Sequence, residues 1–172
     1  NPEDMLLVEK LISQIGYKKY LTGYSENYYR LYHYHMPYER TDKYGRQFFC
    51  EIHWALSLPS PNIILFPDIW KNASMQKVND MSVLCLSPEG MFFSLITQLR
   101  RHNRPFSLRY ICDIYRLIKL YGSRIDWGYI IKESKRNRLK STAYLALYSV
   151  KEILGMPVSE EILTSLNPGL IR

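Results

Sequence analysis

The sequence has few cysteines and no long hydrophobic run. Its three cysteines, Cys50, Cys85 and Cys112, are odd in number and widely spaced, without a Cys-x-x-Cys pair or Cys/His ligand spacing. This spacing argues against a disulfide framework and against a structural zinc site. The cysteines are interpreted as small hydrophobic residues in a reducing cytoplasm. Because no apolar run reaches transmembrane length, we expect no membrane partner.

Glycine-rich catalytic motifs are also missing. The eight glycines form neither a Gly-x-Gly-x-x-Gly turn nor a P-loop, which argues against a dinucleotide-binding fold and a P-loop NTPase. No Gly-x-Ser-x-Gly elbow occurs, and no Cys/His nucleophile pair stands out. The catalytic interpretation therefore depends on carboxylates and histidines.

The first half of the chain has no net charge. Residues 1–86 contain nine Lys and Arg against nine Asp and Glu, whereas residues 87–172 contain fourteen against seven, so the second half carries the whole net charge of +7. A basic half favours an anionic partner, such as nucleic acid or a nucleotide phosphate. The alternative is a solvated helical surface in a basic protein.

The most informative segment is residues 47–56, Gln-Phe-Phe-Cys-Glu-Ile-His-Trp-Ala-Leu. Its period of two predicts a β-strand with one apolar face and a second face that carries Glu51 and His53. Since the strand is otherwise of buried character, an acidic side chain there is expected to be paired or functional. Glu51 is therefore the leading catalytic candidate, with His53 beside it.

Alternation also predicts a strand over Tyr28–Met36, ended or edged by Pro37. A hairpin loop over residues 38–46 would pair this strand antiparallel with the strand of Glu51. Fifteen tyrosines, many between Tyr17 and Tyr44, suit strand packing, with a binding face as the alternative. His33, His35 and His53 allow a zinc site, but histidines in a tyrosine-rich sheet are more often hydrogen-bonded packing residues, which is the favoured interpretation.

Helical patterns open and close the chain. Asn1-Pro2-Glu3-Asp4 predicts a helix start with Asn1 as the cap, and Gly16 the stop. After a surface loop over residues 71–80 and an extended piece over residues 83–86, Ser87-Pro88-Glu89 predicts a second helix start. Further helices follow, with predicted caps at Asp126, Ser141 and Ser159. The expected fold class is α+β: a small antiparallel or mixed sheet in residues 1–86, then a helical bundle in residues 87–172.

Charged residues within the predicted helices have two interpretations. Asp113 is expected to pair with Arg109 or Arg116 one turn away. Arg100, Arg101 and Arg104 crowd the end of one helix, where cations also favour the helix dipole. We expect these three arginines to contact nucleotide phosphates.

The order of several short motifs resembles a known family. Glu51-Ile52-His53-Trp54 and Ser87-Pro88-Glu89 carry the resemblance, supported by the His-x-His segment before them, by Leu-Arg-x-x-x-Asp-Ile and by Asp126-Trp127. The chain is similar over nearly its whole length to uncharacterised bacterial nucleotidyltransferases of the DNA polymerase β-like superfamily. The resemblance implies a small mixed sheet, a Gly-Ser turn for the triphosphate, and three carboxylates that hold two divalent ions.

Glu51 matches the third of those carboxylates. The Gly-Ser turn and the Asp-x-Asp pair of the family would precede residue 1, so the chain resembles the family's carboxyl-terminal portion. The resemblance implies Mg²⁺ as cofactor, and an NTP and an unknown acceptor hydroxyl as substrates. This chain alone is expected to have little activity. Leu7 and Leu11 would then be left on an apolar surface, exposed or buried in a homodimer.

The alternative function is a non-catalytic module whose basic helical half binds nucleic acid or a protein partner. A third option is an interaction or folding subunit without a ligand.

Overall fold

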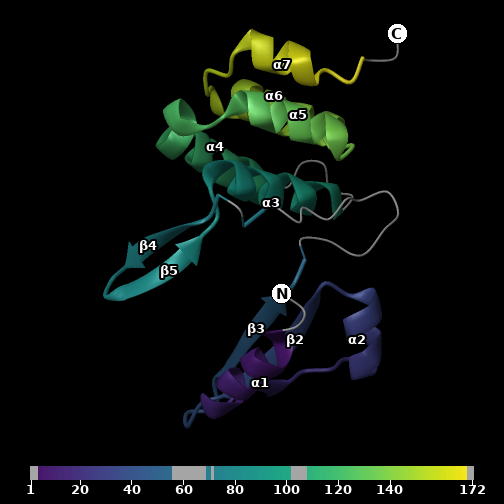
Figure 1. Cartoon of the computed structure of the whole chain (residues 1–172), viewed down its shortest axis with the longest axis vertical. Coiled ribbons are helices and arrows are strands. Elements are labelled where there is room, and N and C mark those ends of the chain that lie inside the picture. Colours follow the sequence, from purple (N-terminus) through teal and green to yellow (C-terminus); the bar gives the residue numbers. More distant parts are fainter. Residues whose placement is uncertain (1–3, 56–68, 71, 102–107, 170–172) are drawn as a thin grey trace. The chain divides into compact units, whose positions relative to one another are not determined.

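The computed structural model describes residues 4–55, 69–70, 72–101 and 108–169, with only the backbone of Arg101. The chain forms two compact units, residues 1–60 and 61–172, which we call the amino-terminal and carboxyl-terminal units (Figure 1). Helices and two small antiparallel sheets give the mixed α+β class that the sequence predicts. The domain boundary at residue 86 stays a prediction.

The amino-terminal unit is built on a three-stranded antiparallel sheet. Its strands are β1 (Lys18–Lys19), β2 (His35–Thr41) and β3 (Gln47–His53), in the order β1-β2-β3. Strands β2 and β3 form a hairpin in which His35 lies opposite His53 and Thr41 lies opposite Gln47. The sequence predicts that the strand before the hairpin loop pairs antiparallel with the strand of Glu51, and the pairing of β2 with β3 confirms this.

The strand predicted over Tyr28–Met36 is wrong for its first half, which forms helix α2 (Glu26–Tyr32). The hydroxyl of Ser25 accepts a hydrogen bond from the Tyr28 N–H at 3.2 Å, and Arg30 pairs with Glu26 one turn away. This cap and this i,i+4 pair outweigh the β propensity of the tyrosines. Pro37 lies inside β2 rather than at its end, and its carbonyl accepts the Tyr20 N–H at 2.9 Å.

Helix α1 (Met5–Gln14) and helix α2 contribute to a small core with the sheet. The buried residues of this core are Met5, Ile12, Tyr29, Met36 and Tyr38. The cap position predicted at Asn1 lies outside the described residues. Ile15 ends the helix, and Gly16 follows with a φ of +86°, a backbone conformation that glycine adopts without a steric penalty.

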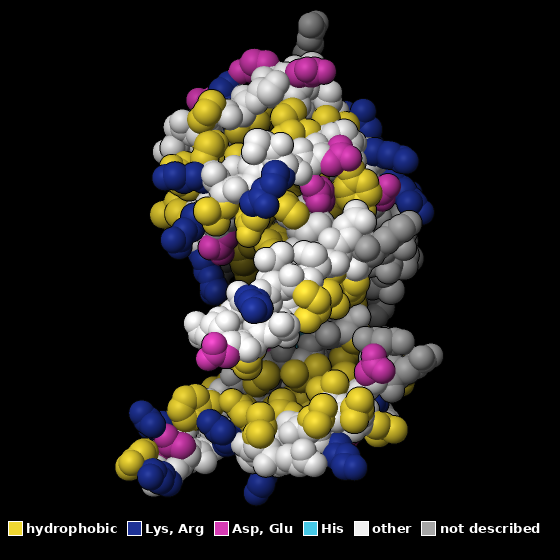
Figure 2. Space-filling model, turned by 60° about the vertical axis from the view of Figure 1, so that its left-hand side comes forward, with side chains coloured by type: hydrophobic (Ala, Val, Ile, Leu, Met, Phe, Trp, Pro, Cys, Tyr) yellow, Lys and Arg dark blue, Asp and Glu magenta, His cyan; other side chains and the backbone are white. Residues whose placement is uncertain are grey.

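The outer face of α1 remains apolar and exposed. Leu7 is 58% exposed and Leu11 is 54% exposed, as the sequence predicts for an uncovered apolar stripe. Figure 2 shows hydrophobic side chains among the surface atoms of the amino-terminal unit. The homodimer through this surface stays a prediction.

The carboxyl-terminal unit contains a second hairpin, formed by β4 (Ser74–Val78) and β5 (Met81–Cys85). The prediction of a loop over residues 71–80 is wrong for β4, while the extended segment after it is confirmed by β5. Asn79, with a φ of +54°, and Asp80 join the two strands. Because both strands are largely exposed, no hydrophobic alternation marked them.

Among its described residues, the carboxyl-terminal unit also contains five helices (Figure 1): α3 (Pro88–Arg101), α4 (Leu108–Tyr121), α5 (Trp127–Arg136), α6 (Lys140–Leu154) and α7 (Glu160–Leu166). A 3-10 turn, Gly122–Arg124, follows α4. Their apolar stripes form one core, whose fully buried members include Phe92, Ile96, Ile114, Ile130 and Leu147. None of the described helices is long and apolar enough to cross a membrane.

The caps predicted for these helices are mostly confirmed. Ser87 accepts the Gly90 N–H at 3.2 Å, Asp126 accepts the Tyr129 N–H at 2.8 Å, and Ser159 accepts the Glu161 N–H at 3.2 Å. The predicted cap at Ser141 is wrong, because α6 begins one residue earlier and Leu139 occupies the cap position.

Candidate functional site

Glu51 lies in the middle of β3, on the strand that the sequence predicted for it. Cys50, Ile52 and Trp54 pack against the small core of the amino-terminal unit. The opposite face carries Glu51 and His53, with side chains 55% and 38% exposed. The expectation that Glu51 lies in a buried strand is therefore wrong: one face is covered and the other meets solvent. An exposed carboxylate has no desolvation cost that demands a partner, so its environment alone does not make it functional.

The hairpin register brings a second histidine to Glu51. His35 lies opposite His53, and their rings stack with centroids 5.1 Å apart. Glu51 Oε2 lies 3.1 Å from His53 Nε2, and Glu51 Oε1 lies 3.8 Å from His35 Nε2. One ligand atom from each of the three side chains lies within 4.8 Å of the others. We call His35, Glu51 and His53 the His-Glu cluster.

His35 is the buried member of the His-Glu cluster, with 9% of its surface exposed. Burial lowers the pKa of His35, the Glu51 carboxylate opposes this effect, and His53 and His33 lower the pKa further. Nδ1 of His35 is buried and has no hydrogen-bond partner among the described residues. A neutral imidazole with a free ring nitrogen is the form that can accept a proton or a metal ion.

His33 does not complete the three-histidine zinc site that the sequence allowed. It caps the carboxyl end of α2, where its N–H donates to the Tyr29 carbonyl at 3.0 Å. Its ring lies 5.5 Å from that of His35, and it is not part of the group of ligand atoms. The signal that identifies the His-Glu cluster is the cross-strand register, which sequence alternation alone does not supply.

Mg²⁺, the cofactor that the resemblance implies, fits the His-Glu cluster only in part. Mg²⁺ prefers oxygen ligands and is commonly held by one or two carboxylates together with substrate phosphates. Glu51 supplies one exposed carboxylate that fits this role. The two imidazoles are ligands that transition metals favour, so the ligand set of the described group does not match the oxygen ligands that Mg²⁺ prefers.

Of the three arginines predicted to bind phosphates, the structure describes the side chain of Arg100 alone. Arg100 is exposed on α3, and its Nη1 donates to the Arg138 carbonyl at 3.1 Å. The side chain of Arg101 and the whole of Arg104 lie outside the described residues. Arg100 and Glu51 belong to different compact units, so their joint role at one site stays a prediction.

Asp113 lies on α4 beside a solvent-open hollow of 410 Å³, which Arg116 and Tyr121 also line. Within the described part of the chain, no ion pair joins Asp113 to Arg109 or Arg116. The predicted pairing is therefore not formed, because exposed partners at this spacing gain little from one fixed geometry.

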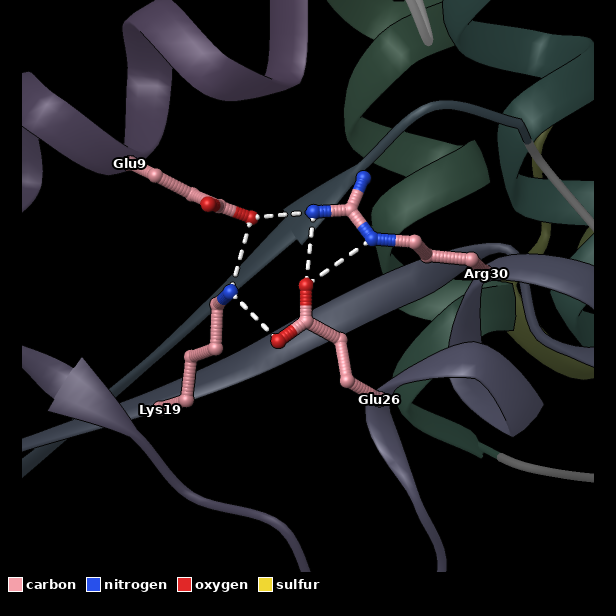
Figure 3. A network of polar contacts seen from close by, with 4 residues as sticks. All are labelled: Glu9, Lys19, Glu26 and Arg30. Atoms are coloured by element: carbon pink, nitrogen blue, oxygen red, sulfur yellow. Dashed lines mark hydrogen bonds and ion pairs between the residues drawn. The ribbon is translucent and has the colours of Figure 1, made fainter.

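A closed network of four charges supports the sheet from the side of the helices (Figure 3). Glu9 of α1 and Glu26 of α2 each pair with Lys19 of β1, at 3.1 and 2.7 Å. Arg30 pairs with the same two carboxylates at 2.8 and 2.7 Å. The hydrogen bonds from Lys19 and Arg30 lower the pKa of Glu26. The network joins three elements and balances its own charge, so we assign it a structural role.

One comparison with known proteins gives a match. The family described as uncharacterised nucleotidyltransferase matches residues 1–155. No curated protein and no solved structure matches the chain significantly.

Proposed function

The chain belongs to this family of uncharacterised nucleotidyltransferases, and we propose that it takes part in transferring a nucleoside monophosphate from an NTP to a hydroxyl group of an acceptor. The observation that supports this is the placement of Glu51. Its carboxylate stands exposed on the β2–β3 hairpin, within Glu51-Ile52-His53-Trp54. A strand whose other face is anchored in a core holds such a ligand rigidly.

The chain's residues would act through binding and orientation. Bound Mg²⁺ would neutralise charge on the phosphates and on the transition state. Glu51 would coordinate the Mg²⁺ ion that is bound to an NTP. His53, whose Nε2 lies 3.1 Å from Glu51 Oε2, would orient the carboxylate. Arg100, Arg101 and Arg104 would contact phosphates or the acceptor.

We expect little turnover from this chain alone. Two-ion transfer depends on several carboxylates around the metals, whereas the cluster found among the described residues contains only Glu51 as a carboxylate. The acceptor, a homodimer and a cytoplasmic location remain predictions.

The test is nucleotide binding with and without Mg²⁺, measured by calorimetry on the full chain. We expect binding of an NTP to require Mg²⁺ and to weaken at least about tenfold in Glu51→Gln, which removes one charged ligand. Glu39→Gln is the matched control, because Glu39 lies on the same sheet face, opposite Phe49, and outside the His-Glu cluster. Binding that is independent of Mg²⁺, or equal in Glu51→Gln and wild type, would contradict the proposal.

A second candidate function, nucleic-acid binding, is favoured by a separate observation. The hydrogen bond from Arg100 to the Arg138 carbonyl joins the end of α3 to the turn between α5 and α6. Lys135 and Arg136 are exposed near that turn, and Figure 2 shows dark blue side chains on the surface of the carboxyl-terminal unit. Basic groups from distant segments thus meet on one surface.

Salt dependence tests this second function. Affinity for single-stranded RNA should fall steeply between low and physiological salt, and the double variant Arg100→Ala, Lys135→Ala should reduce the salt slope by about one to two. Lys77→Ala, on the β4–β5 hairpin, controls for the loss of one positive charge outside this surface. A shallow slope, or the same slope in all three proteins, would rule out this surface.

A further inference from the structure

The His-Glu cluster has the donor set of a transition-metal site. We propose that His35, Glu51 and His53 bind one transition-metal ion of the Zn²⁺ class, with the remaining coordination position open to water. This inference concerns the metal alone and holds whether or not the protein transfers nucleotides.

The donor chemistry selects the metal class. Two imidazole nitrogens and one carboxylate oxygen suit Zn²⁺ and neighbouring transition metals, whereas Mg²⁺ and Ca²⁺ take oxygen ligands. Sites with two His and one Glu as protein ligands and an open fourth position are typical of zinc that remains accessible to small molecules. The exposure of Glu51 and His53 provides that access.

The distances are close to those of a formed site. With metal–ligand bonds of about 2.0–2.1 Å, the ligand atoms of a tetrahedral site lie about 3.3 Å apart. The Glu51–His53 separation is 3.1 Å and the Glu51–His35 separation is 3.8 Å, and the ligand atoms all lie within 4.8 Å. The largest separation therefore has to close by about 1.5 Å, which rotations of exposed side chains can supply.

The scaffold fixes the three residues before any metal binds. Antiparallel pairing of β2 with β3 sets His35 opposite His53, and Glu51 lies two residues along the same strand face. His35 is held by burial, and its Nδ1 lacks a partner among the described residues. The ring presents its Nε2 to Glu51, 3.8 Å from Oε1, so this nitrogen is the one available to a metal ion.

The experiment is a calorimetric titration of the full chain with Zn²⁺, without nucleotide and with Mg²⁺ in large excess. We expect one Zn²⁺ per chain. His53→Gln and Glu51→Gln should each weaken binding at least tenfold, because loss even of outer-shell partners costs about 10–100-fold. Titration with Co²⁺ should give the strong visible absorption of a four-coordinate site, and this absorption should be lost in His53→Gln.

Two control variants keep the test specific. His33→Gln and Glu39→Gln, both outside the cluster, should bind Zn²⁺ as the wild type does, and circular dichroism should show that all variants fold. The inference is overturned if Zn²⁺ binds well below one per chain, if Mg²⁺ displaces it, or if Glu51→Gln and His53→Gln bind as the wild type does. Loss in His33→Gln with retention in Glu51→Gln would overturn it in favour of a three-histidine site. Because no nucleotide is present, failure here is separable from failure of the transferase proposal.

Discussion

The carboxylate of Glu89 accepts a hydrogen bond from the Asp126 N–H at 2.9 Å. Glu89 lies in the first turn of α3 and is 8% exposed, and Asp126 caps α5. Two of the short motifs on which the resemblance rests, Ser87-Pro88-Glu89 and Asp126-Trp127, thus meet in the folded chain. The contact joins two helix starts, so it gives both motifs a structural role.

Removal of this contact should destabilise the carboxyl-terminal unit. Glu89→Ala is expected to lower the free energy of unfolding by about 2 kcal/mol, because the Asp126 N–H loses a charged acceptor in a partly buried hydrogen bond. Glu89→Gln should lower the free energy of unfolding by about half as much, since the amide oxygen of the new side chain still accepts a hydrogen bond from the Asp126 N–H. Urea unfolding followed by helical circular dichroism measures both, with the exposed Glu152→Ala as control. Equal stability of Glu89→Ala and Glu152→Ala would contradict the role of the contact.

Tyr38 buries a hydroxyl group with no hydrogen-bond partner in the described part of the chain. Burial raises the pKa of Tyr38 to about 12, with Glu9 adding to the effect. Tyr38→Phe should therefore raise the free energy of unfolding by about 1 kcal/mol. Because the folded pKa is raised, ionisation of Tyr38 favours the unfolded state, so stability that is present below the unfolded pKa of about 10 is lost as pH rises towards 12.

Absorbance titration near 295 nm checks the ionisation, and urea unfolding checks the stability. The late-titrating tyrosine should disappear in Tyr38→Phe. A destabilised Tyr38→Phe would instead show that the hydroxyl has a partner.

Glu26 gives the four-charge network a pH dependence. Its pKa is lowered, first by the hydrogen bond from Lys19 and then by that from Arg30. A lowered folded pKa stabilises the protein above the unfolded pKa of about 4.5, and this stability is lost as pH falls through the folded pKa. Glu26→Gln should cost only about 0.5–1 kcal/mol at neutral pH, since these side chains are partly solvated.

The measurement is unfolding free energy as a function of pH for wild type and Glu26→Gln. The two curves should converge on acidification below about pH 4.5. Curves that stay parallel throughout that range would show that Glu26 is not the cause of the pH dependence of the unfolding free energy.

Ser25 decides where α2 begins. Ser25→Ala should lower the free energy of unfolding by about 1 kcal/mol, because the Tyr28 N–H loses its acceptor. Ser25→Asp should retain the cap and the stability. Thermal unfolding distinguishes the three proteins, and an unchanged Ser25→Ala would mean that α2 depends on packing alone.

The sequence by itself determined the helices of the carboxyl-terminal unit. The stripes of α3 to α6 follow helical spacing, and Ser87, Asp126, Ser159 and Gly155 mark helix ends through local hydrogen bonds and backbone preference. Such signals act within a few residues, so they are readable along the chain. The strand of Glu51 was found for the same reason, because its alternation is local.

Only the tertiary structure decided which residues meet. Tyr28–Tyr32 alternates like a strand, yet Ser25 and the pairing of Arg30 with Glu9 and Glu26 make it a helix. His35 joins Glu51 and His53 because of a hairpin register that residues on both strands set together. The exposure of Glu51 depends on what covers each face of the sheet, which no single strand encodes. The sequence therefore identified the carboxylate with His53 beside it, and the fold added His35.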